Sequence, residues 1–212
     1  MFFIEKLFSE PQLFFAQLIV VVFSVCCHEY AHAKVALWQG DDTAASNGHL
    51  TLNPLKQMGI FSLLMFIIAG IAWGAVPVIP SRLRHRYSDA LVSFAGPFIN
   101  IAFFLLFTFG LVLMYKFGEG NPALILLFKL GAVINFVLFV INMLPIPGLD
   151  GWGVFSYFMP LEKLIANSSE FIKGSMLFMF VMIFMFCQYI YIAGAYAMGF
   201  IFFMFKFIGF IQ

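Results

Sequence analysis

The sequence has little charge. Only 10% of its 212 residues are Asp, Glu, Lys or Arg, whereas 63% are hydrophobic, and the mean hydropathy is +1.02. An ordinary soluble domain carries about 25% charged residues, so this composition excludes a soluble globular protein. Basic residues exceed acidic ones by only one, 11 against 10, which leaves no basic surface to attract nucleic acid. We therefore expect the lipid bilayer as the environment of the chain and no nucleic-acid partner.

Cysteine is also scarce. The three cysteines, Cys26, Cys27 and Cys187, lie inside apolar runs, and their spacing matches neither a zinc-ligand pattern nor a disulfide framework. We interpret them as small buried residues. The N-terminus lacks the features of a cleaved signal peptide. Glu5, Lys6 and Glu10 stand where a basic region would be, and the apolar run continues without a small-residue cleavage site, so we expect this segment to be retained.

Long apolar runs, by contrast, fill most of the chain. A hydrocarbon core about 30 Å thick requires about 20 apolar residues per helical span. Such runs occur at about 13–37, 90–115 and 123–143, and the stretch 175–211 fits either two short spans or one span and an interfacial helix. The sequence predicts an all-α polytopic membrane protein with about four to six transmembrane helices. Without repeats or long polar insertions, residues 1–212 are expected to form one membrane domain. Its predicted parts are a core at about 13–151 and C-terminal helices at 152–212.

The region after the first long run is irregular. In residues 46–54, Leu50 and Leu52 alternate with polar residues between turn signals, which predicts a short strand or β-hairpin. The next apolar run, 59–80, is interrupted near its end by glycines and prolines. Its helical part is therefore expected to be short.

The first long run contains the sequence His28-Glu29-Tyr30-Ala31-His32. Histidines at this spacing share one helix face, so both imidazoles can reach one cation, for which zinc is the natural candidate. Glu29 lies beside the first histidine, where its carboxylate can take a proton from water acidified by the metal. The alternative is a pair of buried histidines bonded to other helices. Each ionisable group within a span costs at least about 2.5 kcal/mol, which favours a functional role for three such groups together.

A catalytic zinc site requires a third protein ligand. Asp150 is the best candidate, because it follows a span in backbone broken by Pro145 and Pro147, which can turn its carboxylate toward a cavity. The alternative interpretation of Asp150 is a solvated aspartate at a helix end. His49 and His85 are weaker candidates because each lies in a polar connector.

The separation of the two motifs constrains the topology. If every apolar run crossed the membrane, the first and fourth runs would end on opposite sides, and His32 could not approach Asp150. A re-entrant path for residues 59–80 removes this conflict. Basic residues then concentrate on the side of the site, which predicts that the site opens toward the cytoplasm. The flanking residues on that side are Lys34, Lys56, Arg82, Arg84, Arg86, Lys163 and Lys173, against Lys6 and Lys116 on the other, with Lys129 just inside it.

These motifs resemble the site-2 protease family of intramembrane zinc metalloproteases, specifically its small members without a PDZ domain. The sequence HEYAH is similar to the family's zinc and catalytic-base motif, and Asn-Met-Leu-Pro-Ile-Pro-Gly-Leu-Asp-Gly at 142–151 is similar to its second motif. The resemblance implies one zinc ion per chain. It also implies three zinc ligands, His28, His32 and Asp150, a catalytic base, Glu29, and a substrate-binding amide, Asn142.

Two shorter stretches add to the resemblance. Residues 48–54 resemble the strand that follows the family's first motif, and residues 95–97 with Asn100 resemble its next span. The sequence departs from the family at 73–80, which we expect to form an extended edge that pairs with an unwound substrate strand. The departures therefore bear on substrate preference.

The resemblance implies an intramembrane endopeptidase of a bacterial or archaeal inner membrane. Its expected substrates are transmembrane segments of membrane proteins, cut in regulated intramembrane proteolysis or in clearance of signal-peptide remnants. A substrate helix is expected to enter laterally and unwind locally. Two rival functions fit less well: a zinc-binding transporter or sensor in which Glu29 has no catalytic role, and a non-proteolytic scaffold, which has no reason to retain water-activating groups in lipid.

Overall fold

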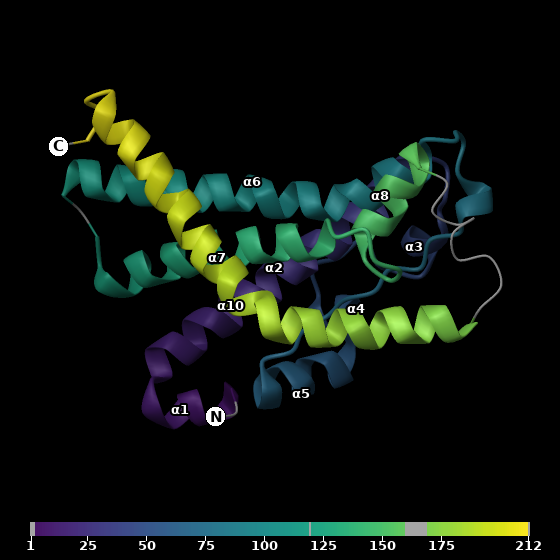
Figure 1. Ribbon diagram of the computed structural model, residues 1–212, viewed down its shortest axis with the longest axis horizontal. Helices are drawn as coiled ribbons and strands as arrows, with labels where there is room; N and C mark the ends of the chain where they lie inside the picture. The colour runs from purple at the N-terminus through teal and green to yellow at the C-terminus, as the bar shows by residue number, and fades with distance from the viewer. Residues whose placement is uncertain (1–2, 119, 160–168, 212) are drawn as a thin grey trace.

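A computed structural model describes residues 3–118, 120–159 and 169–211 of the chain, and every regular element in these ranges is helical (Figure 1). Two short 3-10 helices, η1 (Phe3–Glu5) and η2 (Pro80–Arg82), accompany the α-helices. The α-helices are α1 (Lys6–Ser9), α2 (Pro11–Trp38), α3 (Thr43–Ser46), α4 (Pro54–Gln57), α5 (Gly59–Ala69), α6 (Ser88–Phe117), α7 (Pro122–Asn142), α8 (Asp150–Phe158) and α10 (Ser169–Phe207).

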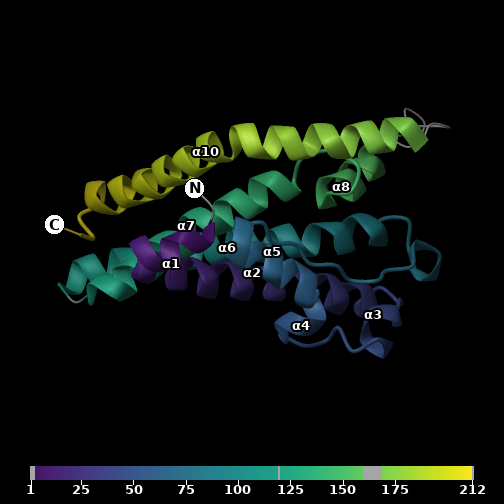
Figure 2. The same ribbon diagram turned by 90° about the horizontal axis from the view of Figure 1, so that it is seen from below.

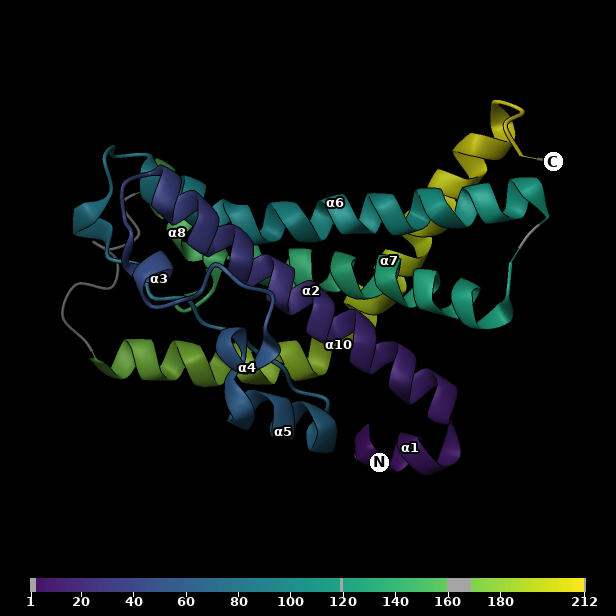
Figure 3. The ribbon, with the colours of Figure 1, turned by 180° about the vertical axis from the view of Figure 1, so that it is seen from behind.

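Within the described part of the chain, four helical segments are long and apolar enough to cross a membrane: α2, α6, α7 and the part of α10 from Cys187 to Phe207. This confirms the lower end of the predicted number of spans. The last apolar stretch, for which the sequence left two short spans and one span with an interfacial helix open, is one continuous helix that changes direction midway (Figures 1 and 3), and its part from Cys187 to Phe207 is a candidate span. The helix continues through Gly194 and Gly199 in its C-terminal half. A glycine costs a helix only about 1 kcal/mol relative to alanine, which does not end it.

The predicted β-hairpin at 46–54 is also wrong, since the structure forms no strand within its described residues. The physical reason is the buried side chain of Gln57. Its amide nitrogen donates to the carbonyl oxygens of His49 (2.8 Å) and Thr51 (2.5 Å), the groups that a paired strand would have used. The Asn53 side chain accepts from the backbone N–H of Leu55 (3.0 Å) and thereby starts α4 instead.

The segment between α2 and α6 leaves and returns to the same end of α2. Helix α5 has 11 residues, too few to span a bilayer, and ends at Gly70 in the left-handed conformation (φ 76°). The chain then runs back in an extended form along α5, where Ser62 Oγ donates to Trp73 O (2.6 Å) and accepts from Trp73 N (2.9 Å). At its far end, Ile79 N donates to Asp41 Oδ2 (2.6 Å), just beyond α2. This is the out-and-back path that the re-entrant prediction requires.

The C-terminal end of α2 therefore meets the N-terminal end of α6. Ser88 Oγ donates to Gln39 Oε1 (2.7 Å), and Arg84 N donates to Gln39 O (2.9 Å). Helix α6 runs antiparallel to α2, and α7 returns beside both (Figure 3). Helix α10 lies on one face of this bundle, and α3 and α4 lie on the opposite face (Figure 2). As a result, α7 ends close to the part of α2 that carries the histidines.

Candidate metal centre and active site

Helix α2 presents His28, Glu29 and His32 toward the interior, and each of the three is only 7% exposed. The two histidines lie one turn apart on one face, as their spacing predicts. Their Nε2 atoms are 3.0 Å apart, and their rings are nearly perpendicular, with 76° between the planes.

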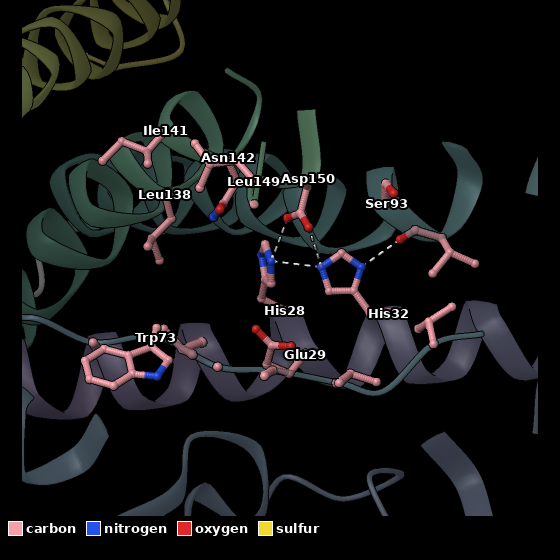
Figure 4. Close-up of a pocket in the computed structure, with 18 of the residues that line it drawn as sticks. His28, Glu29, His32, Trp73, Ser93, Leu138, Ile141, Asn142, Leu149 and Asp150 are labelled. Atoms are coloured by element: carbon pink, nitrogen blue, oxygen red, sulfur yellow. Dashed lines mark hydrogen bonds and ion pairs between the residues drawn. The ribbon is translucent and has the colours of Figure 1, made fainter. Parts of the chain in front are cut away.

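Asp150 is the first residue of α8 and faces both histidines (Figure 4). Its Oδ2 lies 3.0 Å from His28 Nε2, and its Oδ1 lies 3.4 Å from His32 Nε2. Gly148, in the left-handed region (φ 93°), and the extended Leu149 turn the chain from α7 into α8. One ligand atom from each of His28, His32 and Asp150 can be chosen so that all three lie within 4.8 Å of one another.

The partners of the other ring nitrogens decide what this cluster can bind. His32 Nδ1 lies 2.7 Å from the carbonyl oxygen of Val92, which can only accept, so Nδ1 carries the proton and Nε2 a free lone pair. His28 Nδ1 lies 2.6 Å from Asn100 Oδ1, an equivalent arrangement. Asp150 Oδ2 is buried and has no hydrogen-bond donor among the described residues. Lone pairs from three side chains thus converge with no proton between them, which is unfavourable unless a cation joins them.

The spacing of these atoms fits a zinc ion. Tetrahedral zinc with ligand bonds of about 2.0–2.1 Å places its ligand atoms about 3.3 Å apart. The two histidine Nε2 atoms are 3.0 Å apart, and the Asp150 carboxylate lies 3.0 Å from His28 Nε2 through Oδ2 and 3.4 Å from His32 Nε2 through Oδ1. Two imidazoles and one carboxylate are also a ligand set that zinc accepts.

Gly96 of α6 leaves the space in which such an ion would lie. A Cβ atom added at Gly96 would collide with the Nε2 atoms of both His28 and His32. The flanking residues Ala95 and Pro97 are buried, so α6 cannot easily retreat. Any larger residue at 96 would occupy the convergence point of the ligands.

Glu29 faces a cavity of about 740 Å³ that adjoins the cluster (Figure 4). Its carboxylate packs against Gly74 of the returning segment, where an added Cβ would lie 2.5 Å from Glu29 Oε1. One wall of the cavity is residues 71–76, and the others come from α2, α6 and the end of α7. Besides the cluster residues, these walls include Val25, Ser93, Leu138, Ile141 and Asn142.

The structure brings the sequence-predicted site residues to this one place. His28, His32 and Asp150 form the cluster, and Glu29 and Asn142 line the same cavity. The two weaker candidates lie elsewhere: His49 Nδ1 is 3.2 Å from Gln57 Oε1, and His85 stacks on Tyr87 with ring centroids 5.0 Å apart.

Sequence reasoning missed two groups that support the cluster, Asn135 and the Val92 carbonyl. It noted Gly96 and Asn100 only as part of a resemblance, and Gly74 only within the tract 73–80, without a role at the cluster. Two of these residues left a signal, because Asn100 and Asn135 are amides within apolar spans, where an unpaired polar group is costly. The glycines gave none, since their role depends on which helix passes behind them.

The chain is similar to curated bacterial proteins. It is 36% identical over 149 residues to "Putative zinc metalloprotease YwhC" of Bacillus subtilis, covering 67% of this chain and 68% of that protein. It is 33% identical over 140 residues to "Putative zinc metalloprotease Rip2" of Mycolicibacterium smegmatis, covering 61% and 52%. It is 29% identical over 170 residues to the protein of the same name from Mycobacterium tuberculosis, covering 74% and 63%. The chain thus spans about two thirds of the first relative and between half and two thirds of the others. No family model and no solved structure matches the chain.

Proposed function

Because the chain belongs to the site-2 protease family of zinc metalloproteases, we propose that it is an intramembrane endopeptidase that holds one zinc ion per chain. The ligands are His28, His32 and Asp150, the catalytic base is Glu29, and Asn142 binds the substrate backbone.

One observation carries this proposal. The lone pairs of His28, His32 and Asp150 converge from two distant parts of the chain at a buried point, beside a cavity that also holds a glutamate. Three protein ligands leave a fourth position for water or substrate, as a catalytic zinc requires.

The chemistry divides between the metal and the chain. When bound, zinc supplies the Lewis acidity that polarises a peptide carbonyl and acidifies a water molecule. Glu29 accepts the proton from the attacking water at its carboxylate and returns it to the leaving amine nitrogen. The Asn142 amide holds the extended substrate backbone at the end of α7, and the apolar walls of the cavity limit access of bulk water.

The substrates we propose are transmembrane segments of membrane proteins. The cavity lies between helices that are long and apolar enough to cross a membrane, and the returning segment at 71–76 provides extended backbone along one wall. A substrate helix must unwind locally, because helical hydrogen bonds otherwise shield its peptide bonds. The unwound segment can then lie along this wall.

We further propose that the site opens toward the cytoplasm of a bacterial cell. The relatives are bacterial, and two arginines lie at the end of α2 beyond the histidines, where Arg84 N donates to Gln39 O (2.9 Å) and Arg82 pairs with Asp42 (3.1 Å). Basic residues favour the cytoplasmic side of a membrane.

Elemental analysis of the detergent-purified chain tests the metal centre. The parent and Glu29→Gln should each contain about one zinc ion per chain, and His28→Ala and Asp150→Ala much less. His85→Ala is the matched control, since this histidine lies outside the cluster and should not change the zinc content. Unchanged zinc in Asp150→Ala would separate the two motifs and remove the basis of the proposal.

A further inference from the structure

A chain of buried amides connects His28 to α7. Asn100 Oδ1 lies 2.6 Å from His28 Nδ1, and Asn100 Nδ2 donates to Asn135 Oδ1 (2.9 Å). Asn135 Nδ2 in turn donates to Ser24 Oγ and to Gly131 O, both at 2.8 Å. The side chains of Asn100, Asn135 and Ser24 are fully buried. The network therefore links α2, α6 and α7 within the apolar bundle.

The donors and acceptors of this network can be assigned in only one way. Gly131 O is a backbone carbonyl and can only accept, so Asn135 turns its NH2 group toward it and its Oδ1 toward Asn100. Asn100 must donate to that oxygen, which leaves its own Oδ1 facing His28. His28 Nδ1 must then carry the proton, and Nε2 keeps its lone pair.

We propose that Asn100 and Asn135 are positioning residues that fix the tautomer of His28 with an unprotonated Nε2 facing the cluster. The inference rests on the proposed zinc site. If the two amides were turned the other way, Asn100 would donate to His28 Nδ1, and His28 Nε2 would carry a proton at the point where the ligands converge. The tautomer of His32 is fixed by a direct hydrogen bond from Nδ1 to the Val92 carbonyl oxygen. The tautomer of His28 is fixed by the Gly131 carbonyl oxygen through the two intervening amides. Loss of such partners of metal-binding histidines typically costs about 10–100-fold in metal affinity.

Nitrogen-15 NMR of histidine-labelled, metal-free full-length protein in detergent measures the tautomer, and chelator competition measures zinc affinity. In the parent, His28 should be protonated on Nδ1. In Asn135→Leu, an Nε2-protonated population should appear, and zinc affinity should fall by about 10-fold or more.

Two variants control for loss of a buried polar group. Thr108→Val removes a buried hydroxyl of α6 that donates to Phe104 O of its own helix (2.7 Å) and takes no part in the amide network. Ser24→Ala removes one acceptor of Asn135 but leaves the Gly131 carbonyl that sets the direction of the amide. Both should keep the parental tautomer and zinc affinity.

A parent protein protonated on His28 Nε2 would overturn the inference, and so would Asn135→Leu with the parental tautomer and affinity. The first measurement needs no variant, so the inference remains testable if Asn135→Leu does not fold. A parent that has the Nδ1 tautomer but binds no zinc would support the network and contradict the proposed function, which keeps the two failures distinct.

Discussion

At the scale of single residues, a change at Glu29 tests whether metal binding and catalysis can be separated. Its side chain lies beside the cluster, but it is not among the three residues whose ligand atoms converge. Glu29→Gln keeps the shape of the side chain and removes its capacity to accept a proton, so we expect zinc to stay and peptide cleavage to fall by about 10²–10⁴-fold. Cleavage of a reconstituted transmembrane substrate, measured together with zinc content, checks this. Equal cleavage by the variant and the parent would exclude Glu29 as the base.

Gly96 gives a second prediction at this scale. In Gly96→Ala the new methyl group would meet both His28 Nε2 and His32 Nε2, so we expect zinc affinity to fall by at least about 10-fold. The matched control is Gly199→Ala in α10, where an added Cβ meets nothing within 4 Å. Chelator competition and thermal unfolding of both variants distinguish loss of the site from loss of the fold. Parental zinc affinity in Gly96→Ala would show that the ligands do not converge in front of this glycine.

The three residues of the cluster could be predicted from sequence because metal chemistry restricts residue type and spacing. His28 and His32 at one helical turn, and Asp150 in proline-broken backbone, satisfy that restriction without knowledge of the fold. The supporting residues could not be predicted in this way. Asn135 is visible as a costly amide in an apolar helix, but its partners Asn100 and Ser24 come from other helices, and only the packing of the bundle brings them together.

At the scale of elements, apolar length predicted α2, α6 and α7, since a hydrophobic run of about 20 residues has few alternatives to a spanning helix. Local alternation was a poor guide at 46–54. The Gln57 side chain there provides hydrogen bonds that a neighbouring strand would otherwise provide. Likewise, Gly194 and Gly199 did not mark an end of α10, because a glycine costs a helix only about 1 kcal/mol relative to alanine.

The returning segment provides the prediction at this scale, because Asp41 anchors its far end. The buried Asp41 carboxylate accepts from Ile79 N (2.6 Å), Thr43 N (3.0 Å) and Thr43 Oγ1 (2.5 Å). Asp41→Ala leaves these donors without their acceptor, so we expect about 1–3 kcal/mol of destabilisation. The substrate KM should rise while zinc content stays, because the segment forms a cavity wall and no part of the cluster. Asp42→Ala is the control: it breaks only the exposed ion pair with Arg82 (3.1 Å), worth about 0–1 kcal/mol.

The same anchor predicts a pH dependence. Burial opposes the charge of Asp41, but the hydrogen bonds from Ile79 and Thr43 outweigh it and hold the pKa of the carboxyl below its usual value of 3.8. The stabilisation is therefore complete above the ordinary pKa and disappears as the pH falls through the lower pKa of the folded state. Thermal unfolding between neutral pH and pH 3 should show a smaller gap between the parent and Asp41→Ala at the acid end. A constant gap would mean that the carboxylate charge is not what holds the segment.

At the scale of the whole molecule, the re-entrant path decides on which side of the membrane each loop lies. If residues 59–80 return to the end of α2, then Ser46 and Ala123 lie on opposite sides, because only α6 separates them. If the segment crosses instead, two crossings separate these positions and they lie on the same side. Both residues are exposed, so each can carry a reporter cysteine.

Ser46→Cys and Ala123→Cys, each in a background with Cys26, Cys27 and Cys187 replaced by alanine, turn this difference into a labelling experiment. With the site facing the cytoplasm, a membrane-impermeant maleimide should label Ala123→Cys in intact bacterial cells and Ser46→Cys only after lysis. The reverse pattern would preserve the re-entrant path but place the site on the outer side. Labelling of both positions under the same condition would mean that residues 59–80 cross the membrane. The parental zinc content of the cysteine-free background is the control, because it shows that the labelled molecules still bring Asp150 to the two histidines.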